Sequence, residues 1–108
     1  MATYISFLSF TEQGIRTIKD VPARIAAGRQ AIEANGGKLL NYYLTMGAQD
    51  AVIVLEAPDD DTVASIALAT AGLGNIRTAS MRAFSAECHN ASDSLAHLLQ
   101  MKALEIVV

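Results

Sequence analysis

The sequence predicts an α+β domain with the element order βαββαβ. Four segments rich in aliphatic and aromatic residues have the character of strands, and two segments with helical spacing of apolar residues lie between the first and second strands and between the third and fourth. The two middle strands, residues 38–46 and 50–57, are joined by three residues that include Gly47, which is typical of a hairpin. This order predicts a ferredoxin-like fold, in which a four-stranded antiparallel sheet carries both helices on one face.

The first strand, which spans residues 2–10, carries apolar side chains on both of its faces. Tyr4, Leu8 and Phe10 share one face, because side chains alternate along a strand. Since the helices cover a single face of the sheet, we expect these three residues to lie on the open face, opposite residues of the third strand. An open apolar face is a liability in a monomer, so it predicts a homodimer or a higher oligomer of the dimeric α/β-barrel type.

The first long helix is predicted between Pro22, which suits a first turn because it lacks an N–H group, and the stop signal Asn35-Gly36-Gly37. Asp20 is placed to cap its N-terminus. Apolar residues spaced by four, three and four positions predict the face that packs on the sheet: Val21, Ile25, Gly28 and Ile32. The polar residues fall elsewhere and are expected to face solvent: Arg24, Arg29, Gln30 and Glu33.

The second helix, residues 62–73, is apolar around its whole circumference, which predicts a buried helix. Asp59, Asp60 and Asp61 begin it, because carboxylates accept hydrogen bonds from free N–H groups and suit the positive end of the helix dipole. A fourth strand over residues 75–84 completes the sheet.

The character of the chain changes after Ser85, and we divide the chain into a ferredoxin-like domain, residues 1–87, and a C-terminal extension, residues 88–108. The extension contains one further predicted helix and ends in Leu-Glu-Ile-Val-Val. Such an apolar terminus suggests docking on a neighbouring copy, for example as an added strand. An incidental feature of the sequence is the alternative.

Four groups of segments together resemble the GYD-domain family of small prokaryotic proteins. They are Thr3–Ser6 with Phe10–Arg16, Tyr42–Val52, Glu56–Asp60, and Gly74–Thr78 with Arg82–Phe84. The resemblance covers about residues 2–87 and implies a ferredoxin-like or dimeric α/β-barrel protein, with no settled activity for the family as a whole. The family's Gly-Tyr-Asp tripeptide falls where this chain has Gly47-Ala48-Gln49-Asp50, so the Tyr is absent and no role of it is carried over.

The composition bears on the class of function. With 52% hydrophobic and 18% charged residues, the chain has more apolar side chains than one small core easily buries. A net charge of −3 with scattered basic residues provides no footprint for nucleic acid. One cysteine and no Gly-rich phosphate loop lead us to expect no metal and no cofactor. We see no signal-peptide pattern and no membrane-spanning stretch, so we expect a cytoplasmic protein that does not act at a membrane.

Five polar residues are candidates for ligand binding: Tyr42, Tyr43, Asp50, Ser80 and Arg82. The two tyrosines point to opposite faces of their strand, so one could offer a phenol to a mostly apolar pocket; the alternative is that both are core residues. Arg82 shares a face with Ser80, and a guanidinium there requires an anionic ligand or a salt bridge, for which Asp50 is the candidate partner. Asp50 is alternatively a turn residue that accepts backbone N–H groups.

Three functions stay open. The leading one is a small-molecule-binding or accessory protein that acts as a homo-oligomer and takes a small apolar or anionic molecule. The second is a cofactor-free monooxygenase or isomerase, by analogy with other dimeric α/β barrels, with Tyr42 or Tyr43, Arg82 and Asp50 converging on one cavity. The third is a structural or assembly role. Whether the chain is an enzyme is not decided by the sequence.

Overall fold

The computed structural model describes residues 1–86 and 99–100 of the 108-residue chain. The elements follow the predicted order, with a short helix and a 3-10 turn added after the first strand. They are β1 (Ala2–Phe10), α1 (Glu12–Arg16), η1 (Ile18–Asp20), α2 (Val21–Ala34), β2 (Lys38–Leu44), β3 (Ala51–Ala57), α3 (Asp60–Gly72) and β4 (Ile76–Ala83). The apolar tail and most of the C-terminal extension lie outside the described residues.

The four strands form one antiparallel sheet in the order β2-β3-β1-β4. β1 is central, and it pairs with β3, where Tyr4 lies opposite Leu55, and with β4, where Tyr4 lies opposite Arg82. β2 completes the sheet beside β3. The ferredoxin-like α+β fold predicted from the sequence is therefore confirmed.

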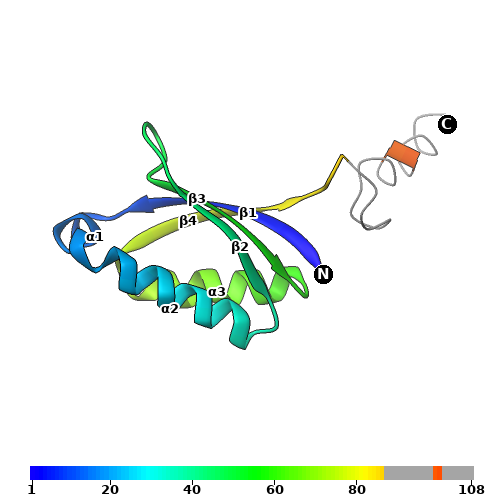
Figure 1. Ribbon diagram of the computed structural model, residues 1–108, viewed down its shortest axis with the longest axis horizontal. Helices are drawn as coiled ribbons and strands as arrows, with labels where there is room; N and C mark the ends of the chain where they lie inside the picture. The colour runs from blue at the N-terminus through cyan, green and yellow to red at the C-terminus, as the bar shows by residue number, and fades with distance from the viewer. Residues whose placement is uncertain (87–98, 101–108) are drawn as a thin grey trace.

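Both long helices lie on the same side of the sheet (Figure 1). The covered face carries Tyr4 and Leu8, which are 3% and 4% exposed, and Phe10, which lines the space beneath the helices. The prediction that these three residues lie on the open face is wrong. The Tyr4 hydroxyl donates a hydrogen bond to Asp60 in the first turn of α3, and this contact ties the Tyr4 face of β1 to the helix layer. The alternate residues of β1 form the open face.

Local signals define most helix ends as expected. Asp59 accepts a hydrogen bond from the Thr62 N–H at 2.8 Å and caps α3, and Gly36, with φ +84°, follows the end of α2. Asp20 stands before α2 without making a side-chain capping hydrogen bond, so that prediction is wrong. The turn η1 leads directly into α2 instead, and the Val21 N–H donates to the Ile18 carbonyl.

The buried core lies between the sheet and the helices. Its members are Ala2, Tyr4, Ile32, Leu39, Leu55, Ala57 and Val63. Within α3 only Val63 is fully buried, and Leu68 on the outer side is 75% exposed. The prediction of a buried α3 is therefore wrong for the single chain, because a helix on one face of a sheet buries only one stripe.

Candidate functional site

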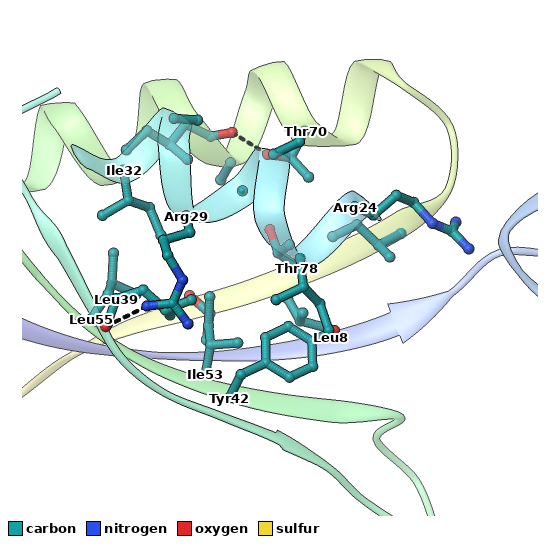
Figure 2. A pocket seen from close by; sticks show the side chains of 18 of the residues that line it. Leu8, Arg24, Arg29, Ile32, Leu39, Tyr42, Ile53, Leu55, Thr70 and Thr78 are labelled. Carbon is teal, nitrogen blue, oxygen red and sulfur yellow. Dashed lines mark hydrogen bonds between the residues drawn. The ribbon is translucent and has the colours of Figure 1, made fainter. Parts of the chain in front are cut away.

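A cavity of about 220 Å³ lies between the sheet and the two long helices. Both α2 and α3 contribute to its walls, and all four strands contribute to its floor (Figure 2). The apolar stripe predicted along α2 lines this cavity: Val21, Ile25, Gly28 and Ile32. A mostly apolar cavity with a few polar groups has the character of a small-molecule site.

An irregularity in β2 places Tyr42 in the cavity. Leu39 and Tyr42 both pair with β3 residues of the helix-covered face, although residues three apart on a regular strand point to opposite faces. The register shifts between Leu39 and Asn41, which makes Leu40 the extra residue of a bulge. Leu39 and Tyr42 consequently both line the cavity (Figure 2).

Hydroxyl groups supply part of the polar lining. The Oγ atoms of Ser6 and Ser80 are 2.6 Å apart and share a hydrogen bond between β1 and β4. Burial raises the pKa of Tyr42 above its ordinary value, and the positive charge of Arg24 partly offsets this rise. Tyr42 therefore remains a neutral phenol near neutral pH, which can donate a hydrogen bond.

Two arginines of α2 also line the cavity, in contrast to the prediction that they face solvent. Arg24 Nη2 donates to the carbonyls of Gly14 and Thr17 at 3.2 and 2.8 Å. Its Nε and Nη1 atoms are buried and find no acceptor among the described residues. Arg29 reaches from α2 toward β2, where its Nη1 lies 3.5 Å from the Leu39 carbonyl (Figure 2). Helical periodicity misses such residues because an arginine stem packs along apolar surface while its head stays polar.

The five residues predicted for ligand binding do not gather at one place. Tyr42 and Ser80 line the cavity, whereas Tyr43 lies on the open face and is 55% exposed. Asp50 Oδ2 accepts the Phe10 N–H at 2.7 Å, as expected for its alternative role in the turn. The Arg82 guanidinium lies 5.1 Å from the centre of the Phe84 ring.

One end of the cavity is held by hydrogen bonds between the start of α1 and the start of β4. The Thr11 N–H donates to the Asn75 carbonyl at 3.0 Å, and the Thr11 hydroxyl donates to the Gly74 carbonyl at 2.5 Å. Gln13 Nε2 donates to the Leu73 carbonyl and to Asn75 Oδ1 at 3.2 and 3.0 Å. Because Leu73 and Asn75 line the cavity, these bonds position part of its wall.

The other face of the sheet has an apolar centre. Ile5 lies opposite Val54 and Met81, and Phe7 lies opposite Val52. We call this surface the open sheet face, and it also includes Ala79 of β4 and Tyr43 of β2. Both long helices, α2 and α3, lie on the opposite side of the sheet (Figure 1). Its composition matches the apolar open face that the sequence predicted, but with Ile5 and Phe7 in place of Tyr4, Leu8 and Phe10.

A family model described as the GYD domain matches residues 4–91. This chain belongs to the GYD-domain family. A curated relative from Thermus thermophilus is 33% identical to it over 84 residues, which make up 77% of this chain and 88% of the relative. That relative is named glutamine synthetase and cystathionine beta-lyase binding protein. The resemblance noted in the sequence is therefore confirmed.

The cavity of this GYD-domain chain combines apolar surface with hydrogen-bonding side chains. In the described part, the lining of the cavity takes its polar groups from hydroxyls, arginine guanidinium groups and an amide. No three His, Cys, Asp or Glu side chains among the described residues gather closely enough to hold a metal ion. None of the helices within the described ranges is long and apolar enough to span a bilayer.

Proposed function

We propose that this GYD-domain protein is an accessory protein that works as a homo-oligomer and acts by binding other molecules. The open sheet face carries this proposal. Ile5, Phe7, Val52, Val54 and Met81 form an apolar centre of the kind that a self-complementary interface buries. A second copy that packs on this face would also accommodate the high apolar content of the sequence.

A charge on the open sheet face tests self-association. Phe7→Glu places a carboxylate at the centre of the face, so we expect it to lower the oligomer to a smaller species in analytical ultracentrifugation. Leu68→Glu is the matched control, because it changes an exposed leucine on the outer side of α3. Circular dichroism reports whether each variant is folded. A wild-type monomer, or an unchanged mass for folded Phe7→Glu, would contradict the proposal.

The name of the Thermus thermophilus relative supports a protein partner. It says that the relative binds glutamine synthetase and cystathionine beta-lyase, and we propose that this chain likewise docks on a metabolic enzyme. The hairpin between β2 and β3 projects beyond the rest of the sheet (Figure 1) and carries Leu44 and Met46, which are 66% and 99% exposed. Two exposed apolar side chains on a projecting hairpin are suited to a protein contact.

The two enzymes named for the relative provide the direct test of this docking. Glutamine synthetase and cystathionine beta-lyase from the same organism as this chain would be immobilised, and binding measured by biolayer interferometry. We expect Met46→Ser to weaken binding to the enzyme without changing the oligomeric state. If Met46→Ser binds the enzymes as tightly as the wild type does, the hairpin is not the docking site. If the wild type binds neither enzyme, these enzymes are not its partners.

The cavity favours small-molecule binding as a second function. Its apolar lining with few polar groups resembles pockets that hold small ligands. The cofactor-free enzyme is less favoured, because Tyr43, Asp50 and Arg82 do not join Tyr42 at the cavity. Native mass spectrometry of freshly purified protein tests the second function, since a retained ligand would add mass to each subunit.

A further inference from the structure

We propose that the cavity binds an amphipathic anion, which has an apolar body and a single carboxylate, and that Arg24 and Arg29 select its charge. This inference rests on the small-molecule function proposed above and adds the class of ligand. Three properties of the cavity support this class of ligand: its volume, the positive charge of its lining, and the buried Arg24 donors that have no acceptor among the described residues.

The size of the cavity suits a small organic body. Its volume is about 220 Å³, and an engineered apolar cavity of about 150 Å³ in another protein accommodates benzene. Ile25, Leu55 and Ile66, from α2, β3 and α3, give it apolar surface on three sides. A molecule with one aromatic ring, or with a chain of about six carbons, is therefore of suitable size.

The charge of the lining is positive although the protein as a whole carries a net charge of −3. Arg24 and Arg29 line the cavity, and no Asp or Glu from the described part of the chain lines it. Since an arginine keeps its charge at every physiological pH, an anion in this cavity meets two cations and no fixed negative charge in the lining. This arrangement selects a carboxylate over a neutral or a cationic head group.

Arg24 supplies the hydrogen-bonding argument. Its Nη2 is held by the carbonyls of Gly14 and Thr17, which fix the position of the guanidinium. Its Nε and Nη1 are buried without an acceptor among the described residues. Buried cationic donors without acceptors are costly, and carboxylate oxygens are the acceptors that compensate them best. The guanidinium lies at the end of the cavity next to Gly14 and Thr17 and points away from Tyr42 (Figure 2), so an anion bound at that end would supply the acceptors that Nε and Nη1 lack.

Arg29 and two hydroxyls complete the recognition. Arg29 reaches from α2 toward β2 (Figure 2), and its 3.5 Å contact with the Leu39 carbonyl is long for a hydrogen bond, so its guanidinium is available to a ligand. The hydroxyls of Tyr42 and Thr78 also line the cavity, and each can donate to an oxygen of the ligand. The ligand thus meets two guanidinium groups and two neutral donors around an apolar body.

Matched pairs of probes test the class of ligand. The probes are 3-phenylpropanoate with 3-phenylpropanamide, and hexanoate with hexanamide, so that each pair differs in the charge of the head group. Their affinities for the full-length protein would be measured by isothermal titration calorimetry, with NMR chemical-shift changes to locate binding. We expect each acid to bind about tenfold or more tightly than its amide, as a hydrogen bond to a charged group implies.

Variants assign this preference to residues. Arg24→Gln is expected to remove most of the preference for the acid and to leave the affinity for the amide nearly unchanged. Arg29→Gln is expected to reduce the preference by a smaller factor, and it provides a second test if loss of the Gly14 and Thr17 contacts unfolds Arg24→Gln. Arg16→Gln is the control, because Arg16 is paired with Glu12 on α1 and does not line the cavity. Ala67→Phe fills the cavity and should abolish binding of both members of each pair.

The outcomes separate the two levels of the proposal. Equal affinities of acid and amide, both lost in Ala67→Phe, would overturn the anion assignment and leave small-molecule binding intact. A preference for the acid that survives in both folded arginine variants would also overturn it. Absence of binding by all four probes would overturn the anion assignment, and a native mass spectrum without a retained ligand would then also remove small-molecule binding.

Discussion

Gly14 lies directly against the backbone of Asn75, so that a Cβ atom at residue 14 would be 2.0 Å from the Asn75 carbonyl oxygen. Such a separation is too short for any side chain. The absence of a Cβ lets α1 approach the start of β4, where Thr11 reaches the carbonyls of Gly74 and Asn75. Two segments that carry the family resemblance, around Gly14 and around Gly74, thus meet in space and hold one end of the cavity.

Gly14→Ala is expected to destabilise the protein, because the new methyl group must displace the backbone of Asn75. Overpacking of this kind costs about 1–3 kcal/mol. Gly28→Ala is the matched control, since Gly28 lies inside α2 and a Cβ atom there would have no atom within 4 Å beyond the adjoining part of the helix. At this position alanine should stabilise the helix by about 0.5–1 kcal/mol. Urea unfolding measures both changes. Equal stabilities of the two variants would contradict the close contact of Gly14 with β4.

Asp59→Ala is expected to lower the thermal midpoint by a few degrees, because it removes the N-cap of α3. Hydrogen bonds from the Thr62 side chain and backbone lower the pKa of Asp59 below its usual 3.8. A lowered folded-state pKa stabilises the protein above the unfolded value, and this contribution is lost as pH falls through the folded value. The difference between wild type and Asp59→Ala should therefore shrink in acid. Asp61→Ala, in the first turn of α3, should have the smaller effect.

The sequence predicts the architecture well, because the signals for it are local. The length of each apolar segment, the Asp59 cap and the Asn35-Gly36-Gly37 stop are each set by neighbouring residues, and the structure contains the corresponding strands and helix ends. The opposite orientation of Tyr42 and Tyr43 follows from the alternation of a strand in the same way.

The site is harder to predict, because it depends on which face of each element turns inward. Both faces of β1 are apolar, so composition alone does not identify the face that the helices cover, and the contact of Tyr4 with Asp60 in α3 is long-range. The helical pattern likewise places Arg24 outside the apolar stripe and predicts that it faces solvent. In the structure its side chain instead extends to the carbonyls of Gly14 and Thr17, to which it donates hydrogen bonds. The signal for these two cavity residues in the sequence is that Arg24 and Arg29 lie beside the apolar stripe of α2 in a chain of negative net charge.

Deletion of Leu40 is expected to preserve the fold. Leu40 is the extra residue of the β2 bulge, so removing it turns an irregular ladder into a regular one and keeps Leu39, Asn41 and Tyr42 on their present faces. Inserting an alanine between Asn41 and Tyr42 should instead send Tyr42 to the open sheet face. A tyrosine absorbance titration in a Tyr43→Phe background measures this, because burial raises the pKa of Tyr42 and the insertion would otherwise turn Tyr43 to the covered face. Retention of that raised pKa in the insertion variant, or its loss in the deletion variant, would contradict the assigned register.

Tyr4→Phe is expected to lower the stability of the protein, and this loss of stability should become smaller at alkaline pH. Burial, followed by the hydrogen bond to Asp60, raises the pKa of Tyr4 from 10.0 to about 12. Since the raised value belongs to the folded state, the contribution of Tyr4 to stability is complete below pH 10, the unfolded value, and is lost as pH rises toward 12. Phenylalanine cannot ionise and makes no hydrogen bond to Asp60. The variant therefore lacks the stabilisation by Tyr4, and its stability does not fall with the ionisation of residue 4 at alkaline pH.

Urea unfolding at a series of pH values measures this difference between wild type and Tyr4→Phe. At pH near 8 the wild type should be more stable by about 1.5–3 kcal/mol, the usual contribution of a hydrogen bond to a carboxylate. The difference should decrease between pH 10 and about 12, as Tyr4 ionises more easily in the unfolded chain than in the folded protein. Tyr43→Phe is the control, because Tyr43 is 55% exposed and lies on the opposite face of the sheet. A difference that stays constant over the whole alkaline range would show that the Tyr4 phenol is not held in its neutral form by α3.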